Sequence, residues 1–422
     1  MSIALRTRTR RGRITGADDA AVADDVSFPA AVRPRLFLLD PVCVLPFGHN
    51  VPSLNYYRRY LSARFDVVSP FVCRHLPEQV EDAAEFRRHF EFYYRDFIRI
   101  AAPETPLPEG PGHSSDRLLQ CARRDVATLL AEHGVGGEDR VFVPSADYYL
   151  VRALIDELLL RAPVNRPRLF LRFIGVMEGA SRSVAAPFEE LLSGLRGAIA
   201  GGLPISLAAE TPSYADLLSV RTGRPVATVP YPLIGEQMKL PADPVLRIYS
   251  AGSARFDKGY LDLLDIARAV ACAPFAERVA FTIQMLPDAD LRSVQTYTSQ
   301  LYACPGVTLL PAILTGAEIQ HEYRRSHAVI MPYDAGIYRM RGSAILMEAI
   351  AYGRSVLTGD GTAFAPQVRH YGNGAVCRSP AEYLAAIEAL LAMPAAEAEL
   401  RLAQARARFA IDTDAAYQNW IR

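Results

Sequence analysis

The chain has 422 residues, which is more than one hydrophobic core usually organises, so two domains of roughly 200 residues each are expected. Half of the residues are hydrophobic and 22% are charged, a balance that indicates a soluble globular protein. The chain has 46 basic residues (lysine and arginine) and 46 acidic residues (aspartate and glutamate), so no net charge favours binding to nucleic acid or to an anionic membrane. No apolar run approaches the ~20 residues that span a bilayer, and the 6 cysteines lack any metal-binding spacing. These features predict a cytoplasmic protein with reduced thiols.

Residues 1–33 differ in composition from the rest of the chain. Arginines cluster near the start of this segment, at Arg6, Arg8, Arg10, Arg11 and Arg13. The segment lacks the apolar stretch of a secretory signal. Two interpretations stay open: a disordered, solvated tail, or a basic arm that makes peripheral contact with anionic lipid near a lipid-linked acceptor.

The segment 34–235 alternates short apolar runs with helical patterns. Short apolar runs between helices are typical of parallel strands that are covered on both faces. Strands are predicted at 36–39, 66–72, 140–143, 168–174, 204–208 and 225–229, and helices at 50–61, 78–100 and 114–133. The segment is therefore predicted to form an N-terminal Rossmann-like domain.

A segment rich in proline, from Tyr231 to Pro244, interrupts this alternation and is the best linker candidate. Strands are then predicted at 246–250, 278–285, 306–310, 328–331, 355–358 and 375–377. Residues 245–400 are predicted to form a second Rossmann-like domain, and 401–422 a C-terminal helix that crosses back to the first. Two doubly wound α/β domains of this kind place a cleft between the carboxyl ends of their strands, where ligands bind.

A short turn follows the first strand of the second domain. Gly252, Arg255, Lys258 and Gly259 stand in the order Gly-x-x-Arg-x-x-Lys-Gly, after a predicted strand and before a predicted helix. A strand-turn-helix unit directs backbone N–H groups at an anion, and arginine and lysine add charged contacts to phosphate oxygens. The pattern predicts a diphosphate-binding turn. The alternative is an ordinary turn with solvated basic residues.

Further along the chain, a helix predicted over 343–353 carries one carboxylate, Glu348. A carboxylate can accept hydrogen bonds from the hydroxyl groups of a ribose. Together with the phosphate-binding turn, Glu348 predicts a site for a nucleoside diphosphate. A protein with such a site would handle an activated sugar.

The two motifs resemble those of the GT-B glycosyltransferases, and within that fold the large retaining GT4-like group (glycosyl transferases group 1). Members carry the same turn and a Glu-Ala-x-Ala-x-Gly-x-Pro-Val segment, which here reads Glu348-Ala-Ile-Ala-Tyr-Gly-Arg-Ser-Val356. The resemblance is specific over about 245–380 and only architectural before it. It implies that Arg255 and Lys258, with Gly252 in the same turn, bind the diphosphate of a nucleotide-sugar donor, and that Glu348 binds the ribose. It also implies that the N-terminal domain holds the acceptor.

One position departs from the pattern of the group. The first of its two acidic residues, which usually contacts the donor sugar, is replaced by Met340. Asp334 or the Tyr338–Arg339 pair could take over that contact. The donor sugar and the stereochemical outcome therefore stay open.

Phosphate binding is also predicted at the start of the helix that carries Glu348, because the backbone N–H groups of Ser343 and Ala344 are expected to face an anion there. Cationic side chains and N–H groups can neutralise a diphosphate, so no metal or other cofactor is expected. Two Asp-x-Asp segments, 288–290 and 412–414, match a metal-binding pattern of the other major glycosyltransferase fold. For the first of them, capping of a helix is the simpler explanation.

In the first domain, the strongest catalytic candidate is His49, in the loop after the first strand. It could act as a base or bind the reacting sugar, and a structural hydrogen bond is the alternative. Arg172 and Glu178 flank the end of another predicted strand, and the segment 210–214 lies at the end of a further one. They could line the acceptor side, or they could be helix caps and solvated charges.

The sequence thus predicts a glycosyltransferase that moves a sugar from a nucleotide-diphosphate donor to a glycan, lipid-linked or small-molecule acceptor, with retention and without metal. One alternative is a nucleotide-sugar epimerase of the same fold, which would need an acid–base pair that the sequence does not reveal. Another is a catalytically degenerate GT-B partner protein, an interpretation that Met340 motivates.

Overall fold

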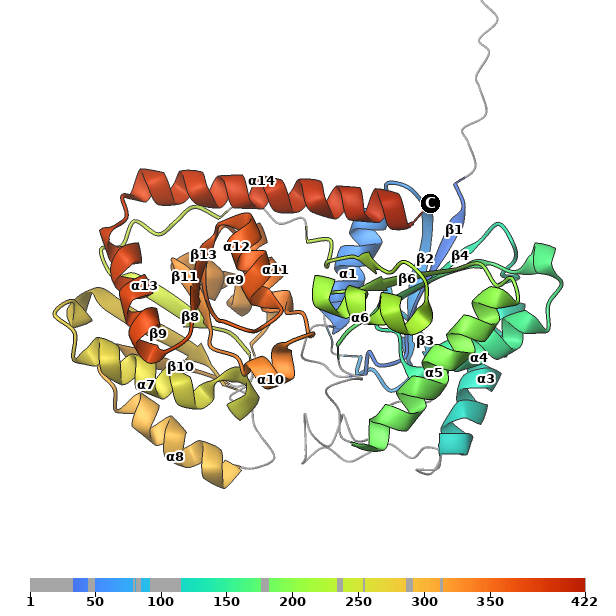
Figure 1. The fold of residues 1–422 in the computed structure, drawn as a ribbon, viewed down its shortest axis with the longest axis horizontal. Coiled ribbons are helices and arrows are strands. Elements are labelled where there is room, and N and C mark those ends of the chain that lie inside the picture. The colour runs from blue at the N-terminus through green and yellow to red at the C-terminus, as the bar shows by residue number, and fades with distance from the viewer. Residues whose placement is uncertain are drawn as a thin grey trace, which may run out of the picture. The chain divides into compact units, whose positions relative to one another are not determined.

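The computed structural model describes residues 33–44, 50–78, 80, 85–91, 115–175, 182–233, 238–252, 255–285, 291–311 and 314–421. Two parallel β-sheets, each flanked by helices, make up the fold (Figure 1). The first sheet has the strand order β3-β2-β1-β4-β5-β6-β7. Its strands are β1 (Arg35–Asp40), β2 (Asp66–Cys73), β3 (Arg87–Phe90), β4 (Arg140–Val143), β5 (Arg168–Phe173), β6 (Ile205–Ala209) and β7 (Ala227–Thr228).

The second sheet has the order β10-β9-β8-β11-β12-β13, and its strands are also parallel. They are β8 (Leu246–Ser250), β9 (Val279–Gln284), β10 (Val307–Leu310), β11 (Ala328–Met331), β12 (Ser355–Gly359) and β13 (Gly374–Cys377). In each sheet the first strand of the chain lies near the middle, the next two strands are added on one side of it, and the remaining strands on the other side. This is the doubly wound arrangement that the alternation of apolar runs predicts.

Helices connect the strands in both halves. Those of the first half are α1 (Asn50–Leu61), α3 (Ser115–Glu132), α4 (Tyr148–Leu159), α5 (Arg182–Ala200) and α6 (Pro212–Thr222). Those of the second half are α7 (Tyr260–Ala271), α8 (Leu291–Tyr302), α9 (Gly316–Arg325), α10 (Ala335–Tyr338), α11 (Ala344–Ala351), α12 (Phe364–Tyr371) and α13 (Pro380–Ala392). The last helix, α14 (Ala395–Trp420), is drawn in red in Figure 1.

Alternation along β1 shows how the cores are divided. Side chains of successive strand residues point to opposite faces of a sheet. Phe37 and Leu39 belong to a cluster with α3, α4 and α5, whereas Leu36 and Leu38 belong to a second cluster. That second cluster also contains residues of β11, β12, α11 and α14, so one continuous apolar core joins the two sheets.

Helix α14 takes part in both halves of Pro34–Arg422, which form one compact unit. It packs against α11 and α12 of the second half. Towards its end, the Trp420 ring lies edge-on to Phe142 and Phe170 of the first sheet, with ring centroids 5.3 and 5.6 Å away. The Tyr417 hydroxyl donates a hydrogen bond of 2.8 Å to the Pro230 carbonyl.

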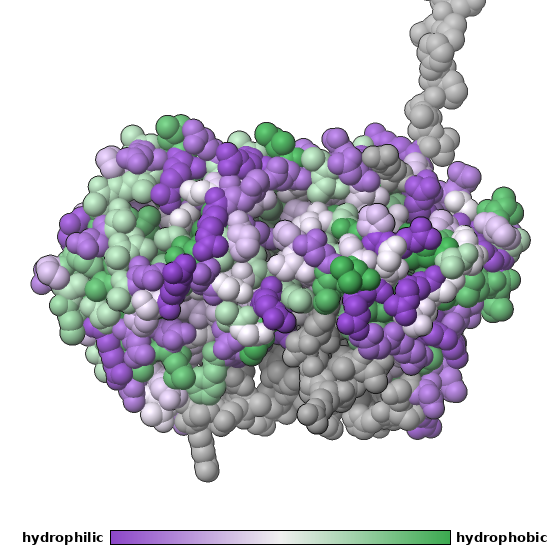
Figure 2. Space-filling model, in the orientation of Figure 1, coloured by the Kyte–Doolittle hydropathy of each residue, from purple (hydrophilic) through white to green (hydrophobic). Residues whose placement is uncertain are grey.

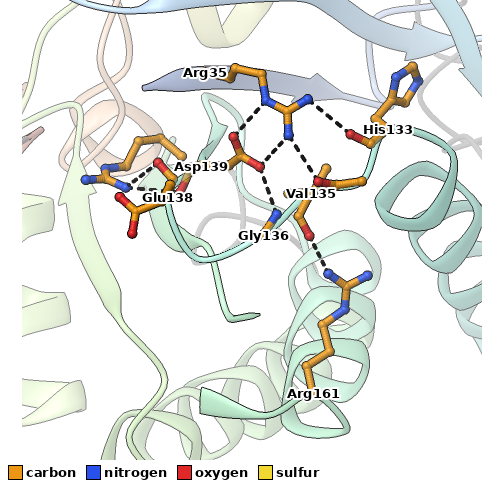
Figure 3. Close-up of polar contacts among 9 residues, drawn as sticks. Arg35, His133, Val135, Gly136, Glu138, Asp139 and Arg161 are labelled. Carbon is orange, nitrogen blue, oxygen red and sulfur yellow. Dashed lines mark hydrogen bonds and ion pairs between the residues drawn. The ribbon is translucent and has the colours of Figure 1, made fainter. Parts of the chain in front are cut away.

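The amino ends of the strands in the first sheet are tied together by a polar network (Figure 3). Arg35, at the start of β1, binds both oxygens of the Asp139 carboxylate at 2.9 and 2.7 Å. It also donates to the carbonyls of His133 and Gly134, just after α3. The Gly136 N–H binds the same carboxylate at 2.8 Å. This network fixes the connection from α3 to β4 at the end of the sheet opposite to the one where ligands bind in such folds.

One predicted element is wrong. The segment 78–100 was expected to be helical, but Arg87–Phe90 form β3, which pairs with β2 at the edge of the first sheet. An edge strand is covered less than an inner one, and Arg87 and Arg88 are exposed. The strand therefore lacks the apolar run by which the inner strands are found.

Hydrophilic and hydrophobic residues are interspersed on the face that Figure 2 shows. This agrees with a chain that has 22% charged residues and equal numbers of acidic and basic side chains. Within the described residues, every helix is too short or too polar to cross a lipid bilayer.

Candidate functional site

The predicted site residues of the second half gather where β8 and β11 end. These two strands are neighbours in the sheet, and the chain leaves them towards opposite sides, which makes this the switch point where doubly wound folds bind ligands. Gly259, with φ of 72°, shows how closely the loops after the two strands approach. A Cβ atom there would lie 1.8 Å from the Pro332 carbonyl oxygen. Only glycine permits this contact.

Gly252 and Lys258 of the predicted phosphate turn lie against each other. Gly252 has φ of 97°, and a Cβ atom on it would lie 2.6 Å from the Lys258 ammonium. The Gly252 N–H donates to Oε1 of Gln284 at 3.3 Å, and the same oxygen accepts the Tyr249 hydroxyl at 2.9 Å. The lysine is thus packed over the backbone at the end of β8.

The ammonium of Lys258 is in an unfavourable environment for a charge. Burial, and then the positive charge of Arg255, lowers its pKa to about 8, although the Asp257 carboxylate opposes this. The ammonium also lies 5.7 Å from the centre of the Tyr333 ring. A bound anion would supply the missing counter-charge, and would therefore be attracted to this position.

Arg255, in contrast, already has an anionic partner. Its guanidinium pairs with Asp257, with Nε 2.7 Å from Oδ1 and a second, shorter contact to Oδ2. The Tyr338 hydroxyl lies 3.3 Å from the guanidinium and 3.4 Å from the carboxylate. Burial raises the pKa of Asp257, but the hydrogen bond from Arg255 and the nearby cations outweigh it, so the net shift is downward. The turn therefore carries two cations and one anion.

Glu348 lies on α11 among tyrosine side chains. Its Oε2 accepts the Tyr323 hydroxyl at 2.9 Å, and among the described residues no hydrogen bond to Oε1 is present. Burial raises the pKa of Glu348 to about 7, which the hydrogen bond from Tyr323 only partly offsets. Burial, and then the charge of Glu348, raises the pKa values of Tyr249, Tyr352 and Tyr56, the last of which belongs to α1 in the first half. One carboxylate oxygen is thus held by the protein, and the other is available to a ligand.

Ser343 and Ala344 open α11, as predicted. Ser343 is the N-cap, and its hydroxyl accepts the Leu346 N–H at 3.4 Å. Asp334, which was considered as a sugar contact, is the N-cap of α10, and its Oδ1 accepts the Ile337 N–H at 3.0 Å.

Met340 contacts the first half of the protein. Its side chain packs against the apolar cluster of the first sheet that contains α3, α4 and α5. The Met340 side chain therefore makes a hydrophobic contact between the two halves of the protein.

The candidates of the first half fall into two groups. His49 and Glu178 lie outside the described residues, as do Asp288 and Asp290 of the second half. Arg172 is 0% exposed and Glu210 is 5% exposed, and their charged groups pair at 3.7 Å inside the protein. The pair is thus part of the core and does not line a solvent-facing acceptor surface.

The second Asp-x-Asp segment lies within α14. Asp412 pairs with His370 at 2.7 Å, and Asp414 accepts a hydrogen bond from Tyr60. Both carboxylates therefore have partners that hold α14 against its neighbours. In the described part of the chain, no group of three or more histidine, cysteine, aspartate or glutamate side chains could hold a metal ion.

Sequence reasoning missed three residues of this region, Asp257, Tyr323 and Gln284, and it named Tyr338 only as a possible contact of the donor sugar. Asp257 stands two positions after Arg255, and that spacing was a usable signal. Tyr323 and Tyr338 reach their partners from 25 and 83 positions away along the chain, so only the fold brings them in.

Solved structures of the same architecture cover nearly the whole chain. The sucrose-phosphate synthase of Thermosynechococcus elongatus is 15% identical with a TM-score of 0.60, covering 92% of this chain and 99% of that one. A UDP-forming α,α-trehalose-phosphate synthase of Burkholderia xenovorans is 13% identical, with a TM-score of 0.60 and coverage of 92% and 97%. The E. coli trehalose-6-phosphate structure with bound UDP-2-fluoro glucose is 13% identical, with a TM-score of 0.58 and coverage of 91% and 96%.

No protein-family model matches the chain, and no curated protein is similar to it in sequence. At these low identities the solved structures establish the fold. The chain has the two-domain GT-B fold of glycosyltransferases, which confirms the predicted fold class. The narrower GT4-like assignment stays a prediction.

Proposed function

We propose that this protein is a glycosyltransferase that uses a nucleotide-diphosphate sugar as donor. The observation that carries the proposal is the position of Lys258, a half-buried residue whose ammonium lies over Gly252 at the end of β8. A cation with a lowered pKa, at the switch point of a GT-B fold, is a fitting partner for a diphosphate.

The residues of the second half have distinct roles in this proposal. Lys258 and Arg255 hold the diphosphate, and Asp257 and Tyr338 keep the Arg255 guanidinium in place. The backbone N–H groups of Ser343 and Ala344 add uncharged donors. Glu348 accepts a ribose hydroxyl at Oε1 while Tyr323 holds Oε2.

Transfer breaks the bond between the sugar and the diphosphate, so negative charge grows on the leaving phosphate oxygen. The two cations and the backbone N–H groups stabilise that charge, which supports transfer without a divalent metal. The resemblance of both motifs to the retaining group supports retention at the sugar. A cytoplasmic location, with lipid contact through the basic tail, is part of this proposal.

The acceptor is open between glycans, lipid-linked molecules and small molecules. Two of the similar structures are named as synthases of sucrose phosphate and trehalose phosphate. A sugar phosphate is therefore the first product class to assay.

The test is a thermal-shift screen with UDP-, GDP-, ADP- and dTDP-glucose, followed by a transfer assay with the sugar that binds. A ligand that binds only the folded state raises its apparent stability by mass action. Stabilisation by one donor and transfer to an acceptor would support the proposal. Epimerisation of the donor without an acceptor would instead indicate the epimerase.

Binding without any turnover would indicate a non-catalytic partner protein. This second candidate is motivated by the residue at position 340, where methionine stands in place of the acidic residue of the resembled group. If no donor binds, both candidates are wrong.

A further inference from the structure

The loop from Arg339 to Ser343, which leads from β11 and α10 to α11, is held by the first half of the protein. The Met340 carbonyl accepts the Thr211 hydroxyl at 2.7 Å. The Arg341 Nε donates to the Gly175 carbonyl at 2.8 Å. The next residue, Gly342, donates its N–H to Oε1 of Glu210 at 2.7 Å.

Glu210 is the centre of this junction. It lies just after β6, and its Oε1 accepts the N–H groups of both Gly342 and Gly175, the latter at 3.1 Å. Its Oε2 faces the buried guanidinium of Arg172, which is itself fixed by hydrogen bonds to the carbonyls of Val229 and Pro144. A buried carboxylate with this many partners has one allowed position.

The loop has donor-site groups at both of its ends. Tyr338, directly before it, contacts the Arg255 guanidinium and the Asp257 carboxylate. Ser343, its last residue, is the N-cap of α11. Arg341 also lies 5.9 Å from the centre of the Tyr338 ring. A shift of the Gly342 peptide would therefore move the groups proposed to hold the diphosphate.

We propose that Glu210, a residue of the first half, is a positioning residue for the donor diphosphate site of the second half. Its carboxylate holds the Gly342 N–H, and so it sets the peptide that opens α11 and the Tyr338–Arg255 contact. The inference rests on the proposed function, because it assigns a role at the same donor site. Glu348 lies further along α11 and is not held by this contact, so ribose binding is independent of Glu210.

Gly342→Ala tests the contact between the Gly342 N–H and the Glu210 carboxylate by a change in the second half of the protein. A Cβ atom on Gly342 would lie 2.7 to 2.9 Å from the Glu210 carboxyl and Cγ atoms, so alanine must displace that side chain or the loop. The variant leaves the buried Arg172–Glu210 pair chemically intact. Glu210→Ala removes the Glu210 carboxyl and Cγ atoms, so the Cβ atom of an alanine at position 342 no longer meets them.

The readout is the ratio of affinities for a nucleoside diphosphate and for its nucleoside, with the tightest binder among UDP, GDP and ADP as the probe. Calorimetry measures the diphosphate and ligand-observed NMR the nucleoside. Gly342→Ala should lower diphosphate affinity by roughly fivefold to tenfold and leave nucleoside affinity unchanged. Adding Gly342→Ala to Glu210→Ala should have no further effect, because both act through one contact.

Two more variants separate positioning from general damage. Glu210→Gln keeps an oxygen acceptor for the Gly342 N–H, so it should retain the wild-type ratio even if Glu210→Ala does not fold. Glu189→Ala, on the same half, removes a surface pair with Arg221 and should change nothing.

An unchanged ratio in Gly342→Ala, or additive losses in the double variant, would overturn the inference while leaving the proposed function intact. Failure of the wild type to bind any of the three diphosphates would overturn both.

Discussion

Glu348→Gln should make the free protein more stable at alkaline pH. The ordinary pKa of a glutamate is 4.5, and burial raises that of Glu348 to about 7. Below pH 4.5 the side chain is protonated in both the folded and the unfolded state, so it adds no pH dependence. Between 4.5 and 7 only the unfolded state ionises freely, and stability falls as pH rises. Glutamine is uncharged, like the protonated glutamate, so Glu348→Gln removes this fall of stability with rising pH.

The size of the effect follows from the shift. Each pKa unit corresponds to about 1.4 kcal/mol, so the full shift sets an upper limit of about 3 kcal/mol. Because Glu348 is only partly buried, a gain of about 1–3 kcal/mol at pH 8 is expected, and almost none at pH 4.

Urea denaturation at several pH values between 4 and 8.5 measures this directly. Glu388→Gln, at an exposed position on α13, is the matched control and should follow the wild type throughout. If Glu348→Gln also follows the wild type, the carboxyl ionises normally, and its surroundings do not make it a pre-formed acceptor for a ribose.

Three further predictions concern the donor. Donor affinity should be highest between pH 7 and pH 8, since an ionised Glu348 is the stronger acceptor for a ribose hydroxyl and a protonated Lys258 binds phosphate. In calorimetry across pH, Glu348→Gln should lose the fall in affinity at acidic pH, and a flat profile in the wild type would contradict both assignments. Glu348→Ala should bind ribose and deoxyribose nucleotides with nearly equal affinity, and a retained preference would place the ribose elsewhere. Transfer should continue in excess chelator, and a loss restored by magnesium or manganese would show that a metal stabilises the leaving group.

The inner strands could be predicted from the sequence because parallel strands buried on both faces have uninterrupted apolar runs. This is why β1, β4 and β11 were found with nearly their observed bounds, whereas the exposed edge strand β3 was taken for a helix. The phosphate turn was found because its glycines, arginine and lysine are local in sequence.

The rest of the site could not be predicted, because its partners come from distant parts of the chain. Nothing near Arg255 indicates that Tyr338, 83 positions away, completes its contacts. The packing of Met340 against the first half depends on a junction in which its carbonyl binds Thr211, 129 positions away. Such contacts exist only once the two halves have packed together.

The most direct test of the central claim is calorimetric titration of UDP, GDP and ADP into the wild type, Arg255→Ala and Lys258→Ala. Losing a charged contact to phosphate typically costs about 1.5–3 kcal/mol, which is roughly a tenfold to hundredfold loss of affinity. One nucleotide should bind the wild type, and each variant should show a loss of that size while its thermal unfolding stays within a few degrees. Equal affinity in all three proteins, or no binding to the wild type, would contradict the assignment of this turn as the diphosphate site.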